Sequence, residues 1–415
     1  MRESAFRASL RLLRTRRFGT FWFASLLSSI GTWAQQVAEP WLLLSLGASS
    51  FLIGLDAFAL GAPVVLLTLV GGLLADRADR RRLIASLQSL QMLCPTLIVG
   101  LLLFHAVRPW MVIALSLVVG TTDALSMPAY QSIVPSIVPR EQIPAGIALT
   151  ATELNLSRIL GPAVAGVLMA SVGAVGAFAV SAASYVPFIW VALWILPPAT
   201  RGPRADAKSF ERGPLLAGVR EVAHQPFLRG ALQTVLVTSL LCAPIVTFCP
   251  VLVKDAFQGD VGHFSLAIGA FGVGGLLGAT GLLAVDPERD RRPLGSWFAV
   301  VYAATLVLTA LNPWPSALPL LFVLAGASMT ASNATANALL QAAAPARIRG
   351  RTVAMFMLAM RGGVSVGSLL TGISVHLLGV RGALLLDGAL AVALHLAVGR
   401  AWRRAPAPLH GTLAP

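Results

Sequence analysis

Seven ionisable side chains lie inside long apolar stretches of the sequence. An ionised side chain costs about 2.5–3.5 kcal/mol to insert at the centre of a bilayer on insertion scales. Positions of this kind therefore indicate proton binding, charge pairing or substrate contact. The seven residues are five acids and two arginines: Glu39, Asp56, Asp123, Glu153, Asp387, Arg158 and Arg361.

Asp123 and Arg158 are the pair that the sequence places near the middle of the membrane. Asp123 lies within segment 109–134 and Arg158 within segment 145–170, and these consecutive segments cross in opposite directions. We expect the two side chains to approach each other, directly or through water. Desolvation favours a protonated carboxyl and a nearby arginine favours an ionised one, so Asp123 is a candidate for proton coupling. The alternative is a static charge pair.

Glu39 is the second candidate for proton coupling. It directly precedes Pro40 and shares a helical face with Gln35 and Gln36 in the outer third of segment 20–43. One interpretation is protonation or cation recognition, and the other is a pairing role within the bundle.

The remaining buried charges have more limited expected roles. Asp56 and Asp387 are expected close to the outer surface, either solvated or capping a helix. Glu153 lies two turns into its segment, where it can pair with cytoplasmic arginines. Arg361 is interpreted as either a packing partner or a substrate contact.

The elements that must position these groups are helices in a membrane. The chain has 415 residues, of which 56% are hydrophobic and only 12% charged, whereas soluble proteins carry about 25% charge. A helix of about 20 apolar residues crosses the hydrocarbon core. The sequence therefore predicts an all-α integral membrane protein and excludes a soluble enzyme, a disulfide scaffold and a disordered chain. The twelve expected spans are 20–43, 52–75, 83–104, 109–134, 145–170, 173–196, 228–253, 263–285, 294–311, 317–342, 351–378 and 381–400.

The basic residues predict the orientation of these spans. The net charge is +14, from 31 Lys and Arg against 17 Asp and Glu. With the N-terminus inside, 26 basic residues fall on the cytoplasmic side and three on the other. This asymmetry follows the positive-inside rule and predicts cytoplasmic termini. The basic charge is thus assigned to the lipid bilayer and not to nucleic acid.

The chain divides into two similar halves. We expect a cytoplasmic segment 1–19, a six-helix bundle 20–196, a cytoplasmic linker 197–227, a second six-helix bundle 228–400 and a tail 401–415. Glycines recur at an offset of 206 residues, as expected for duplicated halves. The matching pairs are Gly161 with Gly367, Gly166 with Gly372, Gly173 with Gly379 and Gly176 with Gly382, together with Pro139 and Pro345.

The loop between the second and third spans carries the most distinctive motif. A pattern Gly-x-Leu-Ala-Asp-Arg-x-x-Arg-Arg is formed by Gly72, Leu74, Ala75, Asp76, Arg77, Arg80 and Arg81. It resembles the loop motif of the major facilitator superfamily, and its Asp-Arg-x-Asp-Arg-Arg-Arg form resembles the bacterial exporter branch that includes enterobactin and macrolide exporters. Asp79 stands where the general pattern has glycine. The alternative interpretation is a basic positive-inside loop. The motif residues predicted to gate the cytoplasmic side are Gly72, Asp76, Arg77, Asp79, Arg80 and Arg81.

A second motif strengthens the resemblance. Gly161, Pro162 and Gly166 are similar to the Gly-Pro-x-x-x-Gly motif of proton-coupled exporters, and we expect them to let the fifth span pack tightly against a neighbour, plausibly the eighth. One departure matters: many drug exporters carry an arginine in the fourth span, where this chain has Asp123. Their proton-relay details therefore do not carry over to this chain.

The resemblance also implies a fold and a cavity. The fold is the major facilitator fold, with the cavity lined by the first, fourth, seventh and tenth spans. Polar residues on those spans are the expected substrate contacts, and interhelical hydrogen bonding is the alternative for each of them. The expected cavity residues are Trp33, Gln35, Gln36, Met127, Tyr130, Gln131, Gln233, Thr238, Ser328, Ser332, Asn333 and Asn337.

These observations predict a secondary transporter. The expected activity is proton-coupled export of a small amphipathic molecule, such as a drug or siderophore, across the bacterial inner membrane by a monomer. The alternatives are lysophospholipid transport, nutrient import, or a membrane sensor or assembly partner that does not transport. The sequence has no Walker loop, no metal-ligand spacing and no catalytic constellation, so we expect no ATP, no metal, no cofactor and no enzymatic activity.

Overall fold

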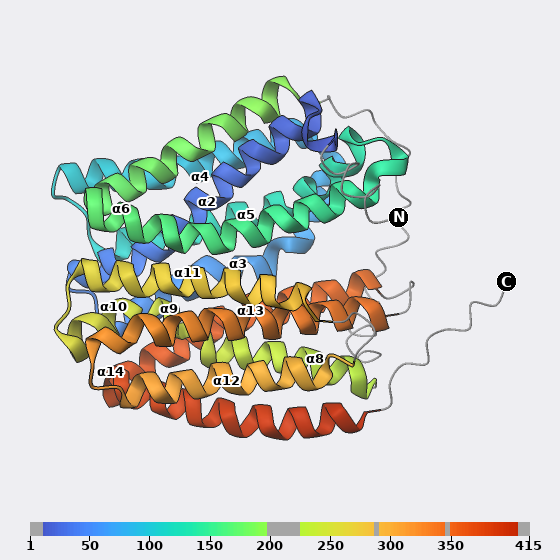
Figure 1. Cartoon of the computed structure of the whole chain (residues 1–415). Helices are drawn as coiled ribbons and strands as arrows, with labels where there is room; N and C mark the ends of the chain where they lie inside the picture. The colour runs from blue at the N-terminus through green and yellow to red at the C-terminus, as the bar shows by residue number, and fades with distance from the viewer. Residues whose placement is uncertain (1–10, 197–224, 286–289, 345–348, 406–415) are drawn as a thin grey trace.

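A computed structural model describes residues 11–196, 225–285, 290–344 and 349–405. Within these ranges the regular structure is entirely helical (Figure 1). The N-terminal half, residues 11–196, contains α2 (Arg16–Ser45), α3 (Ser50–Arg77), α4 (Arg80–Leu103), α5 (Pro109–Ile137) and α6 (Ile143–Trp194). The C-terminal half, residues 225–405, contains α8 (Pro226–Val237), α9 (Pro244–Thr247), α10 (Cys249–Val251), α11 (Val261–Leu283), α12 (Arg292–Leu311), α13 (Leu318–Ala343) and α14 (Arg349–Arg404).

The helices have the length and composition of membrane spans. In the described residues, nine helices are long and apolar enough to cross a bilayer. Exposed tryptophans mark both ends of the helices, with Trp194 and Trp297 at one end and Trp110 and Trp314 at the other. Tryptophan is enriched at the two membrane interfaces. The described helices therefore fit a multi-pass membrane protein.

Each of the twelve expected segments coincides with helix, although their count as separate spans stays a prediction. The fifth and sixth segments are continuous in α6, and the eleventh and twelfth are continuous in α14. Each of these long helices is interrupted by one glycine with positive φ, Gly173 at 67° and Gly379 at 72°. Glycine adopts this conformation without the strain that a side chain would add. The linker 197–224 lies outside the described residues, so the domain boundaries also stay predictions.

The matched glycines make equivalent contacts in the two halves. A Cβ at Gly166 of α6 would lie 2.7 Å from the carbonyl oxygen of Ser265 in α11, and one at Gly372 of α14 would lie 2.9 Å from that of Ser50 in α3. Both contacts join one half to the other. This confirms the expected packing of the fifth span against the eighth, and it shows that glycine is required where backbones approach closely.

A further glycine pair at the same offset, absent from the pairs predicted above, also makes equivalent contacts. Gly120 of α5 packs against the carbonyl of Leu60 in α3, and Gly326 of α13 packs against that of Phe271 in α11. These contacts lie within each half. The sequence signal was the shared offset of 206 residues.

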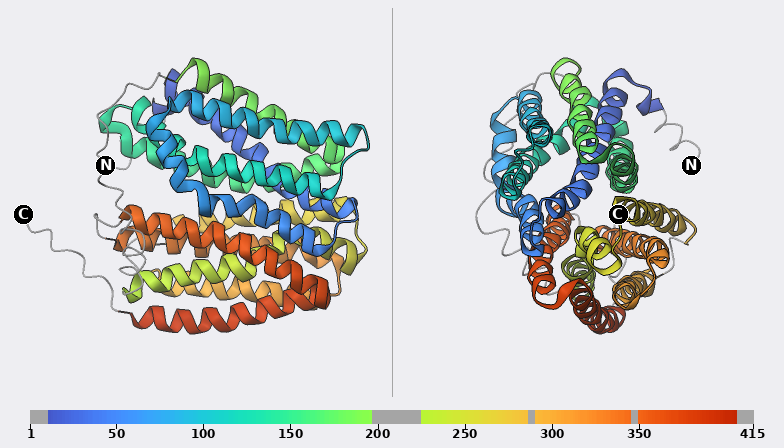
Figure 2. Two further views of the ribbon diagram at one scale, coloured as in Figure 1. Left: turned by 180° about the vertical axis from the view of Figure 1, so that it is seen from behind. Right: turned by 90° about the vertical axis from the view of Figure 1, so that its left-hand side faces the viewer.

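The two halves lie side by side (Figure 2), and they share a hydrophobic core at one end only. We call the end where α2 begins and α14 ends the terminal end, and the other the opposite end. At the opposite end a single cluster joins residues such as Leu42 and Phe178 to Phe264 and Leu318. At the terminal end each half has its own cluster. The halves are therefore packed together at the opposite end.

Candidate functional site

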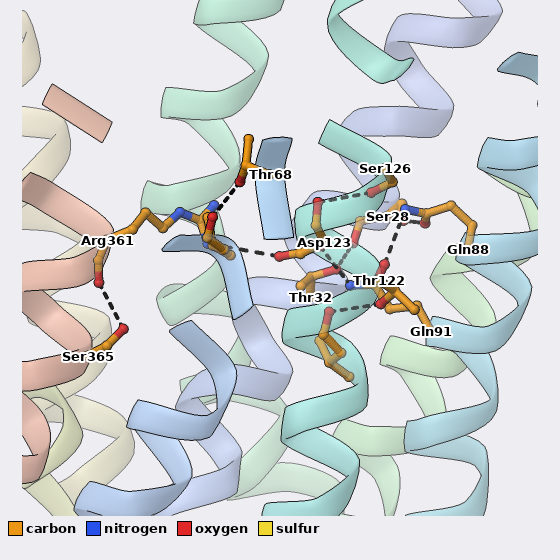
Figure 3. A network of polar contacts seen from close by, with 12 residues as sticks. Ser28, Thr32, Thr68, Gln88, Gln91, Thr122, Asp123, Ser126, Arg361 and Ser365 are labelled. Atoms are coloured by element: carbon orange, nitrogen blue, oxygen red, sulfur yellow. Dashed lines mark hydrogen bonds and ion pairs between the residues drawn. The ribbon is translucent and has the colours of Figure 1, made fainter. Parts of the chain in front are cut away.

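Asp123 of α5 lies at the centre of a polar network that reaches across both halves (Figure 3). Its Oδ1 accepts a hydrogen bond from Gln91 Nε2 of α4 at 3.0 Å. Its Oδ2 lies 3.9 Å from Nη1 of Arg361, which is carried by α14 of the other half. Both charged side chains are partly exposed. Asp123 therefore combines an amide donor in its own half with a cation from the other half.

Amide and hydroxyl groups extend this network through the N-terminal half. Gln88 Nε2 donates to Gln91 Oε1 at 3.2 Å, and the Ser28 hydroxyl donates to Gln88 Oε1 at 3.5 Å. Gln88 and Gln91 were not among the expected site residues. The signal was present, because two amides lie three residues apart in an apolar segment, but the sequence interpretation weighed mainly ionisable groups.

The structure identifies Arg361 as an ionic partner of Asp123. The side chain of Arg158 lies outside the described residues, so the predicted Asp123–Arg158 pair stays a prediction. The reason Arg361 can reach Asp123 is the packing of α14 against α3, where Ser365 faces Gly61. Depth in the membrane alone did not indicate this neighbour.

Glu153 of α6 lies in a second buried cluster nearer the terminal end. Its Oε2 accepts a hydrogen bond from the Tyr130 hydroxyl at 3.2 Å, and that hydroxyl also bonds to Ser25. Oε1 of Glu153 has no hydrogen-bond partner among the described residues. The expectation that Glu153 pairs with arginines is not met there, because tyrosine and serine occupy its surroundings.

Glu39 and Asp56 form a third cluster, toward the opposite end. Gln35 Nε2 donates to Glu39 Oε1 at 2.8 Å, and the Ser181 hydroxyl donates to Gln35 Oε1 at 3.0 Å. Asp56 of α3 lies close enough to Glu39 for their carboxyl groups to interact electrostatically. The shared face of Gln35 and Glu39 is thus confirmed.

The expectation that Asp56 and Asp387 are solvated or cap a helix is wrong. Both side chains are buried. Asp387 Oδ2 accepts a hydrogen bond from the Thr371 hydroxyl at 2.7 Å, inside the C-terminal half. The error arose because distance from a segment end was taken as exposure, although Asp56 faces Glu39 of α2 and Ser116 of α5, and Asp387 faces Thr371 of the same helix.

The expected cavity residues differ in their exposure. Four of them are buried and line no accessible space in this conformation: Gln35, Thr238, Ser328 and Ser332. Gln233 is exposed, and the side chain of Gln131 lies outside the described residues. The others are partly exposed and stay predicted substrate contacts: Trp33, Gln36, Met127, Tyr130, Asn333 and Asn337.

The motif between α3 and α4 has a local structural role at its unusual residue. Asp79 is the N-cap of α4, and its Oδ1 accepts the backbone N–H of Arg81 at 3.0 Å. A side-chain cap of this kind satisfies an amide that the first turn leaves unpaired. Asp79 has φ of −65°, which any residue adopts. The chain therefore needs no glycine here and uses the carboxylate to begin α4.

The rest of this motif is placed only in part. Arg81 Nη1 donates to the carbonyl of Leu193 near the end of α6 at 3.3 Å. The side chains of Asp76 and Arg77 lie outside the described residues. A Cβ at Gly72 would meet no described atom within 4 Å, whereas one at Gly71 would lie 2.7 Å from the carbonyl oxygen of Ala124. Close helix approach at this point is therefore the role of Gly71, and the motif residue Gly72 does not take part in it.

Comparison with known proteins identifies the family. Residues 7–406 match the family described as "Transmembrane secretion effector". The chain belongs to this family. Its relatives within curated proteins include the multidrug efflux pump Tap of Mycolicibacterium fortuitum, with 27% identity over 80% of this chain and 82% of that protein. The enterobactin exporter EntS of Shigella boydii serotype 4 is 26% identical over 76% of this chain and 78% of that protein.

A third relative matches over a shorter region. The staphyloferrin A transporter of Staphylococcus aureus is 24% identical, over 62% of this chain and 64% of its own length. This chain thus spans less than two thirds of that relative. Relatives of the transmembrane secretion effector chain therefore include proteins named for siderophore transport and for drug efflux.

Solved structures confirm the major facilitator fold. The nucleoside transporter NupG superposes with a TM-score of 0.73 at 14% identity, covering 94% of this chain and all of that one. A bacterial homologue of the human lysosomal transporter Spinster, in an inward-facing and unoccupied conformation, superposes with a TM-score of 0.68 at 14% identity, covering 94% and 98%. These likenesses show the fold, and they agree with the family match over residues 7–406.

Proposed function

We propose that this protein exports a small amphipathic molecule of the siderophore or drug type from the bacterial cytoplasm, driven by proton entry. The proposal places it in the inner membrane with both termini in the cytoplasm, in line with the distribution of its basic residues. The relatives named for siderophore and drug transport support the class of substrate.

The packing of the two halves supports alternating access. The halves share a core at the opposite end and have separate cores at the terminal end. In the proposed orientation, this conformation has its outer side closed. Rocking of the halves would break the shared core and join the separate ones, since packed interfaces switch between discrete arrangements.

The observation that carries proton coupling is the ion pair between Asp123 and Arg361. It is the contact by which a carboxylate of one half meets a cation of the other. A proton taken up by Asp123 would remove the attraction to Arg361 and weaken the connection between the halves. Uptake of a proton and movement of the halves would then be linked at one residue.

An accumulation assay tests this proposal. Dyes, antibiotics and siderophores are loaded into an efflux-deficient bacterium that expresses the wild-type protein, Asp123→Asn or Arg361→Gln, with and without a protonophore. Asp255→Asn is the matched control, because it makes the same change at an exposed carboxylate. We expect wild type and Asp255→Asn to lower accumulation of at least one compound, and the protonophore and both network variants to abolish this effect.

Two results would contradict the proposal. Higher accumulation with the wild-type protein would indicate import. Full activity of Asp123→Asn under a protonophore would show that neither this carboxyl nor the proton gradient drives transport.

A further inference from the structure

Glu39 and Asp56 bring two carboxyl groups together in the interior of the N-terminal half. Glu39 is 2% exposed and Asp56 3% exposed, and their carboxyl groups interact electrostatically. They come from different helices, α2 and α3. Two neighbouring carboxylates that have lost their hydration repel each other, so they do not both stay ionised.

No cation balances this pair in the described part of the chain. The groups facing it are the amide of Gln35 from α2 and the hydroxyl of Ser116 from α5. The titratable neighbours of Glu39 on other helices are the thiol of Cys94 in α4 and the phenol of Tyr185 in α6. Neither supplies positive charge.

Two polar atoms in the cluster have no hydrogen-bond partner among the residues that the structure describes. These are Asp56 Oδ1 and the hydroxyl oxygen of Ser116, which lies beside both carboxyl groups and is 1% exposed. Buried polar groups without partners are uncommon and call for an explanation. A hydrogen placed between the carboxyl groups would give Asp56 the partner it lacks.

A proton fits this site better than a metal cation. A hard cation takes about six oxygen ligands, whereas the site offers two carboxyl groups and one hydroxyl. In addition, Gln35 directs an N–H group at Glu39 Oε1, 2.8 Å away. That donor would face a bound cation with the same sign of charge. We therefore propose that Glu39 and Asp56 hold one shared proton, and that this pair is the outer proton-binding site of the transporter.

The position of the pair links its access to water with the packing of the two halves at the outer side. Two residues beyond Glu39, Trp41 stacks on Phe264 of the other half with ring centroids 5.0 Å apart. Two residues before Asp56, Gly54 packs against the backbone of Ser368 in α14. Opening the outer side separates both contacts, which would admit water to the carboxyl groups and let the proton exchange. This role as a coupling site rests on the proposed function.

Infrared spectroscopy of the purified protein in lipid measures the proton directly. A protonated carboxyl group has a C=O stretching band that a carboxylate lacks. We compare wild type with Glu39→Gln, Asp56→Asn, the double variant Glu39→Gln/Asp56→Asn and the control Asp387→Asn, which alters a buried carboxyl in the other half. Difference spectra are recorded at neutral and alkaline pH, and each variant is first checked for monodisperse elution.

We expect a wild-type band at neutral pH that disappears on alkalinisation. The double variant Glu39→Gln/Asp56→Asn should lose this band, because it removes both groups that could hold the proton. Each single amide variant should keep a band at a changed frequency, because desolvation favours the protonated form of the remaining carboxyl and the group that shared its proton is gone. Asp387→Asn should keep the wild-type band. Ser116→Ala retains both carboxyl groups, so it should keep the band at a changed frequency and serves where an amide variant fails to fold.

Persistence of the band in the double variant Glu39→Gln/Asp56→Asn, or an unchanged frequency in either single variant, would overturn the proposal. So would its disappearance when sodium is added at constant pH, since that would show a metal cation in the site. This measurement needs no substrate. A titrating band in a protein that lowers accumulation of no compound would leave the proton site intact and refute the export proposal alone.

Discussion

Alanine at Gly166 should open the end of the molecule that is closed in this structure. The added Cβ would lie 2.7 Å from the carbonyl oxygen of Ser265, and the equivalent substitution Gly372→Ala would place it 2.9 Å from that of Ser50. Both neighbours are backbone atoms, which cannot turn aside. The helices α6 and α11, or α14 and α3, must therefore separate by several tenths of an ångström.

The size of the effect follows from overpacking, which costs about 1–3 kcal/mol. The gain in helix propensity from glycine to alanine applies to the open and the closed conformation alike, so it does not change their ratio. Both contacts join the two halves at the opposite end, so a conformation open at that end does not carry the overpacking cost. The ratio of open to closed molecules should rise about five- to 150-fold, since 1.4 kcal/mol is a factor of ten.

Spin-label distances measure this ratio. Labels at Ser45 and Lys254 report on exposed positions at the opposite end, one in each half. The three native cysteines are buried and can be replaced first. We expect a longer distance to gain population in Gly166→Ala and Gly372→Ala.

Glycines of two other kinds serve as controls. Gly269→Ala in α11 adds a Cβ with no described atom within 4 Å and should change neither the distance nor, by more than about 1 kcal/mol, the stability. Gly120→Ala and Gly326→Ala strain contacts within a half, so they should lower the thermal midpoint without changing the distance. The reasoning fails if Gly166→Ala only lowers the midpoint, or if Gly120→Ala shifts the distance.

Two predictions concern helix starts outside the bilayer. Asp79→Ala removes the cap of α4 and should destabilise the folded protein by about 0.5–2 kcal/mol in thermal unfolding; an unchanged midpoint would show that the cap contributes nothing. At α11, hydrogen bonds from His263 hold the pKa of the exposed Asp260 below its usual value. The ionised Asp260 side chain should therefore cap α11 at and above the usual pKa range of an aspartate. The cap should be lost only when the pH falls through the lowered pKa of Asp260. Hydrogen exchange of the first turn of α11, corrected for intrinsic rate and compared with Asp260→Ala, measures this; equal protection in both at neutral pH would contradict it.

The features that could be predicted from the sequence are those that depend on the residue type and its immediate neighbours in the chain. Apolar length indicated the helices, and the 206-residue offset indicated which glycines would play equivalent roles. Gly173 and Gly379 have nearly the same backbone conformation because a reversal between antiparallel helices needs positive φ at one residue. These inferences need no knowledge of which helix faces which.

The predictions that failed concern residues whose neighbours lie far away in the sequence. Asp56 was expected to be solvated because it lies near a segment end, but its side chain is buried beside Glu39 of α2 and Ser116 of α5. Arg361 was left between two roles because nothing in segment 351–378 indicates that its side chain reaches α5. Such contacts are set by the rotation of each helix about its axis and by the packing of the halves, which periodicity in a uniformly apolar helix does not reveal.

The two halves thus share their packing but not their acids. Gly161, Gly166 and Gly173 each have a glycine 206 residues later, whereas Asp123 and Glu153 correspond to Met329 and Ala359. Only glycine fits where two helix backbones approach closely, and both halves carry glycine at these positions. Buried carboxyl groups meet no packing demand and cost free energy unless they are used. They are concentrated in the N-terminal half, and Arg361 of the other half contacts Asp123. The proposed mechanism therefore assigns proton chemistry to one half and the response to the movement of both.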